Sequence, residues 1–240
     1  MDSISFQPIG IVHSCFKEKF GIPRQPGLAP QARAELELFS PYNRPEAFTG
    51  LEQCSHIWLQ FVFHGIAREQ WKPTVRPPRF GGNQRMGVFA TRSTHRPNPI
   101  GLSVVKLDAI EGRESGEVRL RLSGVDLLDG TPVLDIKPYI PYVDAVVDAH
   151  CEFADTQPEC LPVCWSGQTL AAAESYESET GLPLIDLVEQ VLQQDPRPAY
   201  QTPDTERVYG MRLYDLNIQW RYSMNKVWEI HVINIENFTD

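Results

Sequence analysis

Three side chains that can hold or exchange protons lie in the segment DIKPY, which contains Asp135, Lys137 and Tyr139. Asp135 and Lys137 are two residues apart, so in a β-strand both would project from the same face. A carboxylate beside an ammonium group can accept a proton in an acid–base step. The same pair can equally be a solvated ion pair that contributes little. Both interpretations stay open, because no motif identifies the base.

The segment ATRSTHRPNPIG, residues 90–101, combines cationic side chains with two prolines. Each proline fixes its own φ and restricts the residue before it to extended conformations, so the segment should be stiff. It belongs to a basic window, residues 70–107, that contains seven Lys and Arg residues and no Asp or Glu. The whole chain has a formal charge of −9, so the other residues together carry −16. A face that binds phosphates must exclude carboxylates, and this window therefore favours a nucleic-acid partner.

Two turn-like segments could also hold a ligand. Gln25, Pro26 and Gly27 form a turn in which glycine permits a close approach of the backbone, although most such tetrapeptides are plain β-turns. The segment DLLDG, residues 126–130, could be an ordinary turn between two strands. Phe63 and His64 end an apolar strand, where the histidine could line a cavity or be a hydrogen-bonded core residue.

Short segments between Gly/Pro turns are predicted to be the strands that position these groups; most alternate apolar and polar residues, whereas residues 57–63 are nearly all apolar. They are residues 4–14, 34–39, 57–63, 86–91, 102–107, 118–122 and 133–137. Seven short strands between Gly/Pro turns favour a β-barrel or a β-sandwich. A Rossmann fold is not expected, because no G-x-G-x-x-G segment follows a strand.

The composition changes near residue 149, where an acidic stretch begins that we interpret as the junction with a second unit. Within residues 182–194 the leucines and valines fall on one helical face, and the prolines of DPRPAY end this helix. Predicted strands follow at 208–213, 218–222 and 227–235. We expect a mainly β protein, with a β-barrel domain at 1–148 and a small α+β domain at 149–240.

The chain has 240 residues, of which 42% are hydrophobic, and this is enough to bury a substantial core. No stretch reaches the length of apolar sequence that a membrane span needs, and the first residues do not form a signal peptide. We therefore expect a soluble, cytosolic protein. The five cysteines show no C-x-x-C spacing, so the sequence indicates neither a disulfide framework nor a metal site.

Long segments of the chain resemble the family of S-adenosylmethionine-dependent tRNA methyltransferases that methylate N6 of threonylcarbamoyladenosine next to the anticodon. The segments are GIPRQPGLAP (21–30), WLQFVFH (58–64), RMGVFATRSTHRPNPIGLS (85–103) and SGVDLLDGTPVLDIKPY (123–139). The resemblance extends over nearly the whole chain and includes QDPRPAY near residue 195. It implies a TsaA-like β-barrel, S-adenosylmethionine as cofactor, the anticodon stem-loop of a threonine-type tRNA as partner, and a homodimer.

Beside this resemblance, the residues can be matched to the parts of the cofactor and of the RNA. Arg92 suits the cofactor carboxylate, because a guanidinium is a forked, charge-assisted donor. The residues expected to bind the cofactor are Gln25, Pro26, Gly27, Phe63, His64, Arg92, Leu102, Asp126, Leu127, Leu128 and Asp129, with backbone groups acting for the last four. The residues expected to contact RNA are Arg79, Arg85, His95, Arg96, Arg197 and Tyr200.

Two hypotheses about function follow. The first is a tRNA methyltransferase, in which Asp135, Lys137 and Tyr139 are the candidates for removing a proton from the acceptor nitrogen. The second is a non-catalytic module that binds S-adenosylmethionine or RNA. The DPRPAY segment fits the first hypothesis as an RNA contact, but it could also be only a turn that ends a helix.

Overall fold

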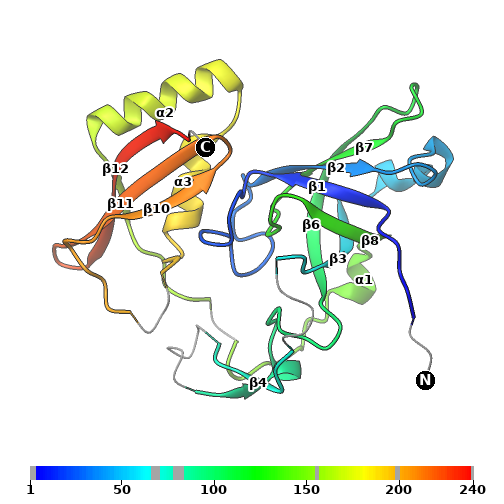
Figure 1. Ribbon diagram of the computed structural model, residues 1–240, viewed down its shortest axis with the longest axis horizontal. Coiled ribbons are helices and arrows are strands. Elements are labelled where there is room, and N and C mark those ends of the chain that lie inside the picture. The colour runs from blue at the N-terminus through cyan, green and yellow to red at the C-terminus, as the bar shows by residue number, and fades with distance from the viewer. Residues whose placement is uncertain (1–3, 66–70, 78–83, 155–156, 198–200, 239–240) are drawn as a thin grey trace.

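A closed barrel of six strands and a separate four-stranded sheet make up most of the protein (Figure 1). The computed structural model describes residues 4–65, 71–77, 84–154, 157–197 and 201–238. The barrel strands are β1 (Gly10–Ser14), β2 (Arg33–Leu38), β3 (His56–Val62), β6 (Ile100–Glu111), β7 (Arg119–Ser123) and β8 (Thr131–Pro138). They close in the order β1-β2-β7-β6-β3-β8, so the prediction of a mainly β protein with a barrel is confirmed.

Every second side chain along a barrel strand points inward, and these side chains fill the barrel interior. In β3 the inward residues Ile57, Leu59 and Phe61 are buried, while the residues between them are half-buried on the outer face. Gly101 is the register partner of Phe61, and a Cβ placed on it would lie 2.3 Å from the Phe61 ring. The glycine therefore lets this ring pack across the barrel wall.

Three connections gather at one end of the barrel. The register pairs Val12 with Thr131, Val62 with Ile100, and Arg33 with Ser123. The β1–β2, β3–β6 and β7–β8 connections consequently emerge together. Most of the predicted cofactor residues lie on these three connections, so the topology brings them to the same end of the barrel.

The long β3–β6 connection differs from the prediction. It carries a small ribbon of β4 (Thr74–Val75) and β5 (Met86–Gly87), followed by the 3₁₀ turn η4 (Val88–Ala90). The strand predicted for residues 86–91 is therefore wrong beyond Gly87. Shorter elements elsewhere are η1 (Pro45–Phe48), η2 (Leu51–Gln53) and α1 (Pro141–Asp144).

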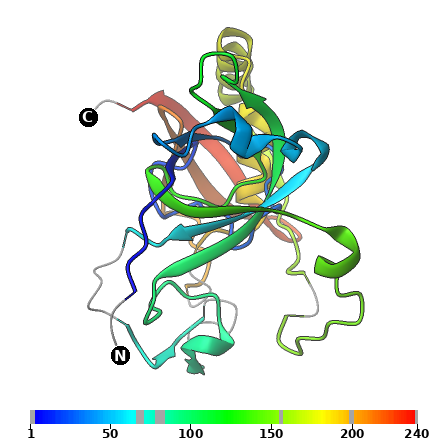
Figure 2. The ribbon, with the colours of Figure 1, turned by 90° about the vertical axis from the view of Figure 1, so that its right-hand side faces the viewer.

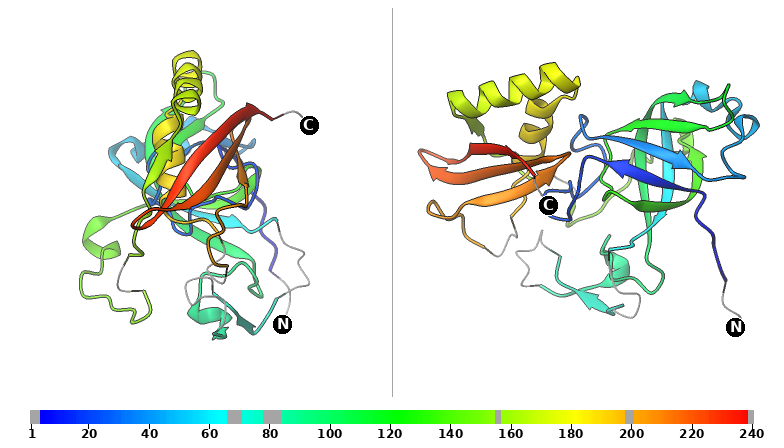
Figure 3. Two further views of the ribbon diagram at one scale, coloured as in Figure 1. Left: turned by 90° about the vertical axis from the view of Figure 1, so that its left-hand side faces the viewer. Right: turned by 45° about the horizontal axis from the view of Figure 1, so that its top comes forward.

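The second sheet has the order β10-β11-β12-β9, in which only β9 and β12 run parallel. Its strands are β9 (Val163–Trp165), β10 (Tyr209–Leu213), β11 (Leu216–Met224) and β12 (Trp228–Asn237). Two helices, α2 (Gly167–Thr180) and α3 (Leu184–Leu192), lie on one face of the sheet (Figures 1 and 3). The predicted helix corresponds to α3, which buries its leucines and valines on one face as expected.

The acidic stretch that we interpreted as a junction contains β9 and the 14-residue helix α2. Its apolar pattern is weak, because only Thr169 and Ala173 are buried. The helix is instead delimited by its caps. The Ser166 side chain accepts a hydrogen bond from the Thr169 N–H, and Gly181 ends the helix with a φ of 69°.

The β1–β2 connection joins the barrel to the second sheet (Figure 3). Phe16 forms an isolated bridge with Leu213, and the Tyr214 N–H donates to the Cys15 carbonyl at 2.8 Å. Phe20 stacks on Trp220 with ring centroids 5.8 Å apart. The buried residues of the two parts form one continuous core. Figure 2 views the barrel from its side, with the second sheet behind it.

Within the described residues, the helices are all too short or too polar to cross a membrane.

Candidate functional site

A polar cluster joins the three connections at the end of the barrel. The Ser103 hydroxyl, near the start of β6, donates to Asp126 Oδ1 at 2.7 Å. Arg92 Nη1, on the β3–β6 connection, donates to Gln25 Oε1 on the β1–β2 connection. The positive charge of Arg92 also acts on Asp126. We call Gln25, Arg92, Ser103 and Asp126 the mouth cluster.

Asp126 is the carboxyl group of the mouth cluster, and its pKa is strongly shifted. Burial raises the pKa of its carboxyl from 3.8 to about 6, although the Ser103 hydrogen bond and the Arg92 charge both act to lower it. A carboxylate that is costly to ionise, next to a single guanidinium, is a typical feature of a binding or catalytic site. A ligand that brings positive charge would therefore stabilise the ionised form of Asp126.

The Gln25–Gly27 turn is fixed against the loop that carries Asp126. The Gly27 N–H donates to the Gly124 carbonyl at 2.9 Å. Gly27 and Gly124 have φ values of 77° and 71°, which lie in the left-handed region that favours glycine. Pro26 lies within the same turn. The two loops are thereby held together through their backbones.

The rest of the DLLDG loop is bound to the end of β1. The carbonyl of Leu127, a buried core residue, accepts from the Ser14 hydroxyl at 2.7 Å. Asp129 Oδ1 accepts from the Ser14 N–H at 2.8 Å, and Oδ2 pairs with Lys17 at 2.9 Å. The Leu128 carbonyl accepts from the Thr131 N–H at 3.2 Å. These groups fix the loop to the end of β1, whereas the Asp126 side chain bonds to Ser103 on β6.

Phe63 and His64 lie at the same end of the barrel. The Phe63 N–H donates to the Pro99 carbonyl at 2.8 Å, and its ring packs edge-on against Phe61 with centroids 5.3 Å apart. His64 is exposed and lies beside Gly130. Of the two alternatives for this histidine, the structure therefore excludes the buried core residue.

The candidate acid–base residues lie on the outer face of the barrel wall. Lys137 Nζ is 2.6 Å from Asp135 Oδ2, and the two side chains are about half exposed. Asp135 and Leu102 are both register partners of Gln60, so all three share one row across β8, β3 and β6. Leu102 is 51% exposed on this face, whereas its neighbour Ser103 is only 2% exposed and points inward.

Tyr139 extends this outer row beyond the end of β8. Its ring lies 5.8 Å from that of Trp58, centroid to centroid. We call Leu102, Asp135, Lys137 and Tyr139 together the outer row. The outer row lies on the other side of the barrel wall from Ser103, because side chains alternate along each strand, and the contact of Leu102 with the cofactor stays a prediction.

The basic segment contains both structural and exposed cations. Arg96 donates to the carbonyls of Thr91 at 2.8 Å and Val88 at 3.3 Å, and its guanidinium lies 5.7 Å from the centre of the Phe89 ring. Arg96 thus braces the loop that carries Arg92, and its contact with RNA stays a prediction. The His95 N–H donates to Ser93 Oγ at 3.3 Å.

Other cations of the window point to solvent. Lys72, Arg76 and Arg85 are exposed, and they form the accessible part of the basic surface. Arg79 and Tyr200, which we predicted to contact RNA, lie outside the described residues.

Arg197 is largely buried in the second part of the chain. Its side chain is 15% exposed and pairs with Asp195 at 2.9 Å, and its guanidinium lies 5.7 Å from the centre of the Tyr222 ring. Tyr222 also donates to Asp195 at 2.7 Å. Arg197 therefore braces this loop, and its contact with RNA stays a prediction.

Sequence reasoning missed Ser103 and the side chain of Asp126 as a pair. The sequence indicated only that Ser103 occupies an inward position of a predicted strand, and it did not indicate that Asp126 is its partner. The contact itself depends on how the β7–β8 loop folds over the barrel end.

Family models match both parts of the chain. The model of the tRNA-methyltransferase O N-terminal domain matches residues 11–145, and that of the TrmO C-terminal domain matches residues 158–238. The tRNA (adenine(37)-N6)-methyltransferase of Escherichia coli K12 is 46% identical over 224 residues, which cover 92% of this chain and 94% of the relative.

A relative and a solved structure from Pseudomonas aeruginosa are also similar to this chain. RcsF, whose name places it provisionally among S-adenosylmethionine-dependent methyltransferases, is 56% identical over 218 residues, covering 91% of this chain and 92% of the relative. A crystal structure of TrmO superposes with a TM-score of 0.83 at 47% identity and covers 99% of both chains. The chain therefore belongs to the tRNA-methyltransferase O family.

Proposed function

We propose that this protein transfers the methyl group of S-adenosylmethionine to N6 of adenine 37 in tRNA, with threonylcarbamoyladenosine in a threonine-type tRNA as the acceptor. The observation that carries this proposal is the mouth cluster, in which a half-buried carboxylate and a guanidinium face the same barrel end. Membership of a tRNA methyltransferase family favours the enzyme over a non-catalytic binding module.

The residues present fit S-adenosylmethionine. This cofactor carries a carboxylate, an ammonium and a sulfonium group, and when bound it supplies an electrophilic methyl group. Arg92 would hold the carboxylate by charge-assisted hydrogen bonds. Asp126 would face the positive charge, which offsets the cost of its burial. Phe63, His64 and Leu128 border the same barrel end and would line the site.

The chain's own residues mainly provide orientation. Gln25 holds the Arg92 guanidinium, and Ser103 holds the Asp126 carboxylate. The Gly27–Gly124 hydrogen bond keeps the two loops in register. Methyl transfer to nitrogen is an in-line displacement, so fixed positions for donor and acceptor are the main source of rate.

We propose that the outer row contributes to catalysis in a homodimer. The acceptor nitrogen has an attached carbonyl group that acidifies its proton, so a base should help to remove this proton. Of the three candidates, we propose Asp135, which Lys137 holds, as the base, although it lies on the outer face of its own barrel. A second protomer that covers this face would bring its own mouth cluster toward the row.

The outer face has the apolar surface that such a dimer needs. Exposed large apolar side chains on β6 and around α1 are Ile100, Leu102, Ile140, Tyr142, Val143, Val146 and Val147. The hydrogen bond from Trp58 Nε1 to Asp144 Oδ2, at 3.0 Å, holds α1 beside β3. An apolar surface of this kind on a water-exposed face is typical of a protein interface.

The basic surface of Lys72, Arg76 and Arg85 is proposed to bind the phosphates of the anticodon stem-loop. Arg79 and His95 would extend it, and Arg197 and Tyr200 would contact RNA from the second part of the chain. We place the enzyme in the cytoplasm, because its proposed substrate is tRNA.

The test is mass spectrometry of nucleosides from threonine-type tRNA after incubation with the protein and S-adenosylmethionine. We expect threonylcarbamoyladenosine to gain one methyl group, and Arg92→Ala and Asp135→Asn each to lose most activity. Mixing the two inactive variants under subunit exchange should restore part of the activity, because one site of a mixed dimer would contain both native groups. Unmethylated tRNA with the native protein would reject the proposed reaction, and failure of the mixture alone would reject the shared site.

A further inference from the structure

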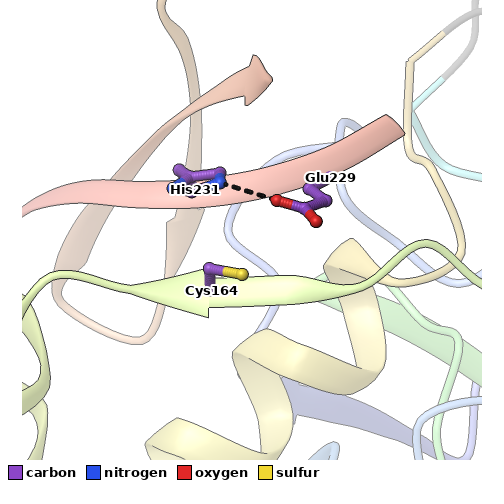
Figure 4. Close-up of side chains that lie close together, drawn as sticks. All are labelled: Cys164, Glu229 and His231. Carbon is purple, nitrogen blue, oxygen red and sulfur yellow. Dashed lines mark hydrogen bonds and ion pairs between the residues drawn. The ribbon is translucent and has the colours of Figure 1, made fainter. Parts of the chain in front are cut away.

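We propose that Cys164, Glu229 and His231 bind a divalent transition-metal ion, with Zn²⁺ as the best-fitting candidate. The three residues lie on the neighbouring strands β9 and β12, in the second sheet and outside the proposed methyltransfer site (Figure 4). This proposal does not rest on the proposed function, because it uses none of the residues of the mouth cluster, the outer row or the basic surface.

Strand pairing brings the three side chains together. Cys164 is the parallel register partner of His231. Ile230 and Val232 are buried under the helices, so Glu229 and His231, which alternate with them, project from the opposite face of β12. Cys164 is half-buried and forms no disulfide. The sequence did not predict this site, because its ligands come from strands that are distant in the chain rather than from a C-x-x-C motif.

The distances suit a tetrahedral ion. The thiol, imidazole and carboxylate ligand atoms all lie within 4.8 Å of one another, and His231 Nε2 is 3.3 Å from Glu229 Oε2. Zinc bonds of about 2.0–2.3 Å at tetrahedral angles place neighbouring ligand atoms about 3.3–3.5 Å apart. The nitrogen and oxygen already have this spacing, and the sulfur needs to move by about 1.3 Å at most to reach it.

The chemistry of the three ligands is also selective. A thiolate, an imidazole and a carboxylate are the set that Zn²⁺ accepts, whereas Mg²⁺ and Ca²⁺ prefer oxygen ligands alone. Binding would release the thiol proton and displace the proton on the metal-binding ring nitrogen of His231, to solvent from an imidazolium or to the other ring nitrogen in the neutral ring; two bonds to the metal would replace the contact between His231 and Glu229. The fourth position would be taken by water, as in sites with three protein ligands.

Partial exposure leaves a path for the ion. The side chains of His231 and Glu229 are 43% and 21% exposed. Arg221 on β11 is the register partner of His231 and is exposed on the same face of the sheet. Its charge opposes a cation, so Arg221→Gln should strengthen metal binding.

A bound ion would stabilise the edge of the sheet. β9 contributes only three residues and pairs with β12 at three register positions. A metal that links Cys164 to His231 and Glu229 would cross-link these two strands, so it should stabilise the folded protein by an amount that grows with the logarithm of its free concentration above the Kd.

The test is a Co²⁺ titration of the reduced, metal-free full-length protein, with the sulfur-to-cobalt charge-transfer band as the readout. We expect a saturable band at one ion per chain. Cys164→Ser should abolish it, and His231→Gln should weaken binding by about tenfold or more, since even outer partners of metal ligands contribute that much. The matched control is Cys160→Ser, which removes an exposed thiol outside the cluster and should leave the band unchanged.

Thermal unfolding with and without Zn²⁺ provides a second readout that does not need a thiol band. Zn²⁺ should raise the Tm of the native protein and of Cys160→Ser, but not that of His231→Gln, which keeps a side chain able to hydrogen-bond to Glu229. Absence of a saturable band in the native protein, its persistence in Cys164→Ser, or an equal Zn²⁺ effect on the native protein and His231→Gln would each overturn the proposal.

Discussion

Replacement of Asp126 by Asn should stabilise the protein at neutral pH and weaken cofactor binding at the same time. The asparagine keeps an oxygen that can accept the Ser103 hydroxyl hydrogen bond, which is 2.7 Å long in the native protein. It removes the negative charge whose burial is costly. The same charge is the group that we expect to face the positive part of S-adenosylmethionine, so stability and binding should change in opposite directions.

The size of the effect follows from the pKa of Asp126. A carboxyl whose pKa rises from 3.8 to about 6 on folding costs the folded state up to about 3 kcal/mol when it is fully ionised. Between pH 3.8 and about pH 6 the folded protein binds more protons than the unfolded chain, so its stability falls as the pH rises. The cost is therefore complete above about pH 6 and absent below about pH 4.

Urea unfolding at pH 7.5 and pH 4.5 measures this difference. We expect Asp126→Asn to be more stable than the native protein by about 1–3 kcal/mol at pH 7.5, and the difference to shrink strongly at pH 4.5. Calorimetry at pH 7.5 should show weaker binding of S-adenosylmethionine. The matched control is Asp129→Asn, which breaks the ion pair with Lys17 and should not be stabilising. A variant that is less stable than the native protein at pH 7.5, or a difference that does not depend on pH, would refute the reasoning.

The remaining predictions concern single side chains with clear partners. Arg92→Ala should weaken S-adenosylmethionine binding about 10–100-fold in calorimetry, because a charge-assisted hydrogen bond contributes about 1.5–3 kcal/mol; an affinity within twofold of native would contradict this. Arg85→Ala should leave cofactor affinity unchanged but weaken tRNA binding and lower the salt slope by about 1, and an unaltered slope would remove its phosphate contact. Val147, which is 98% exposed, should lie in the proposed dimer interface, so we expect a dimeric mass for the native protein in light scattering and a monomeric mass for Val147→Glu; equal masses would contradict this. Gly101→Ala should cost about 1–3 kcal/mol in urea unfolding, since its Cβ would lie 2.3 Å from the Phe61 ring; native stability would mean that the ring moves freely.

From the sequence one could read short strands that fit a barrel or a sandwich, a family resemblance that implies the barrel, and the segments that carry chemistry. Period-two alternation in β2 specifies one buried face, and short strands of this kind must close or pair to bury it. In β3 most residues are apolar, so its sequence indicated a strand but not which face is buried. The helix α3 was also readable, because its leucines and valines form one continuous apolar face. The helix α2 was not found from its apolar pattern, since its two buried positions give almost no stripe and only its caps mark it.

Only the tertiary structure decided which of these residues meet. Ser103 and Leu102 are neighbours in sequence, yet one binds Asp126 inside the barrel and the other faces solvent, because the inward side of β6 is set by its pairing with β3. Arg85 and Arg96 are both basic, yet Arg85 is exposed whereas Arg96 donates hydrogen bonds to backbone carbonyls. The fold of the β3–β6 connection decides this difference. Cys164 likewise reaches His231 through strand register alone. Such contacts join distant segments, and their geometry is fixed by sheet pairing and loop packing rather than by local sequence spacing.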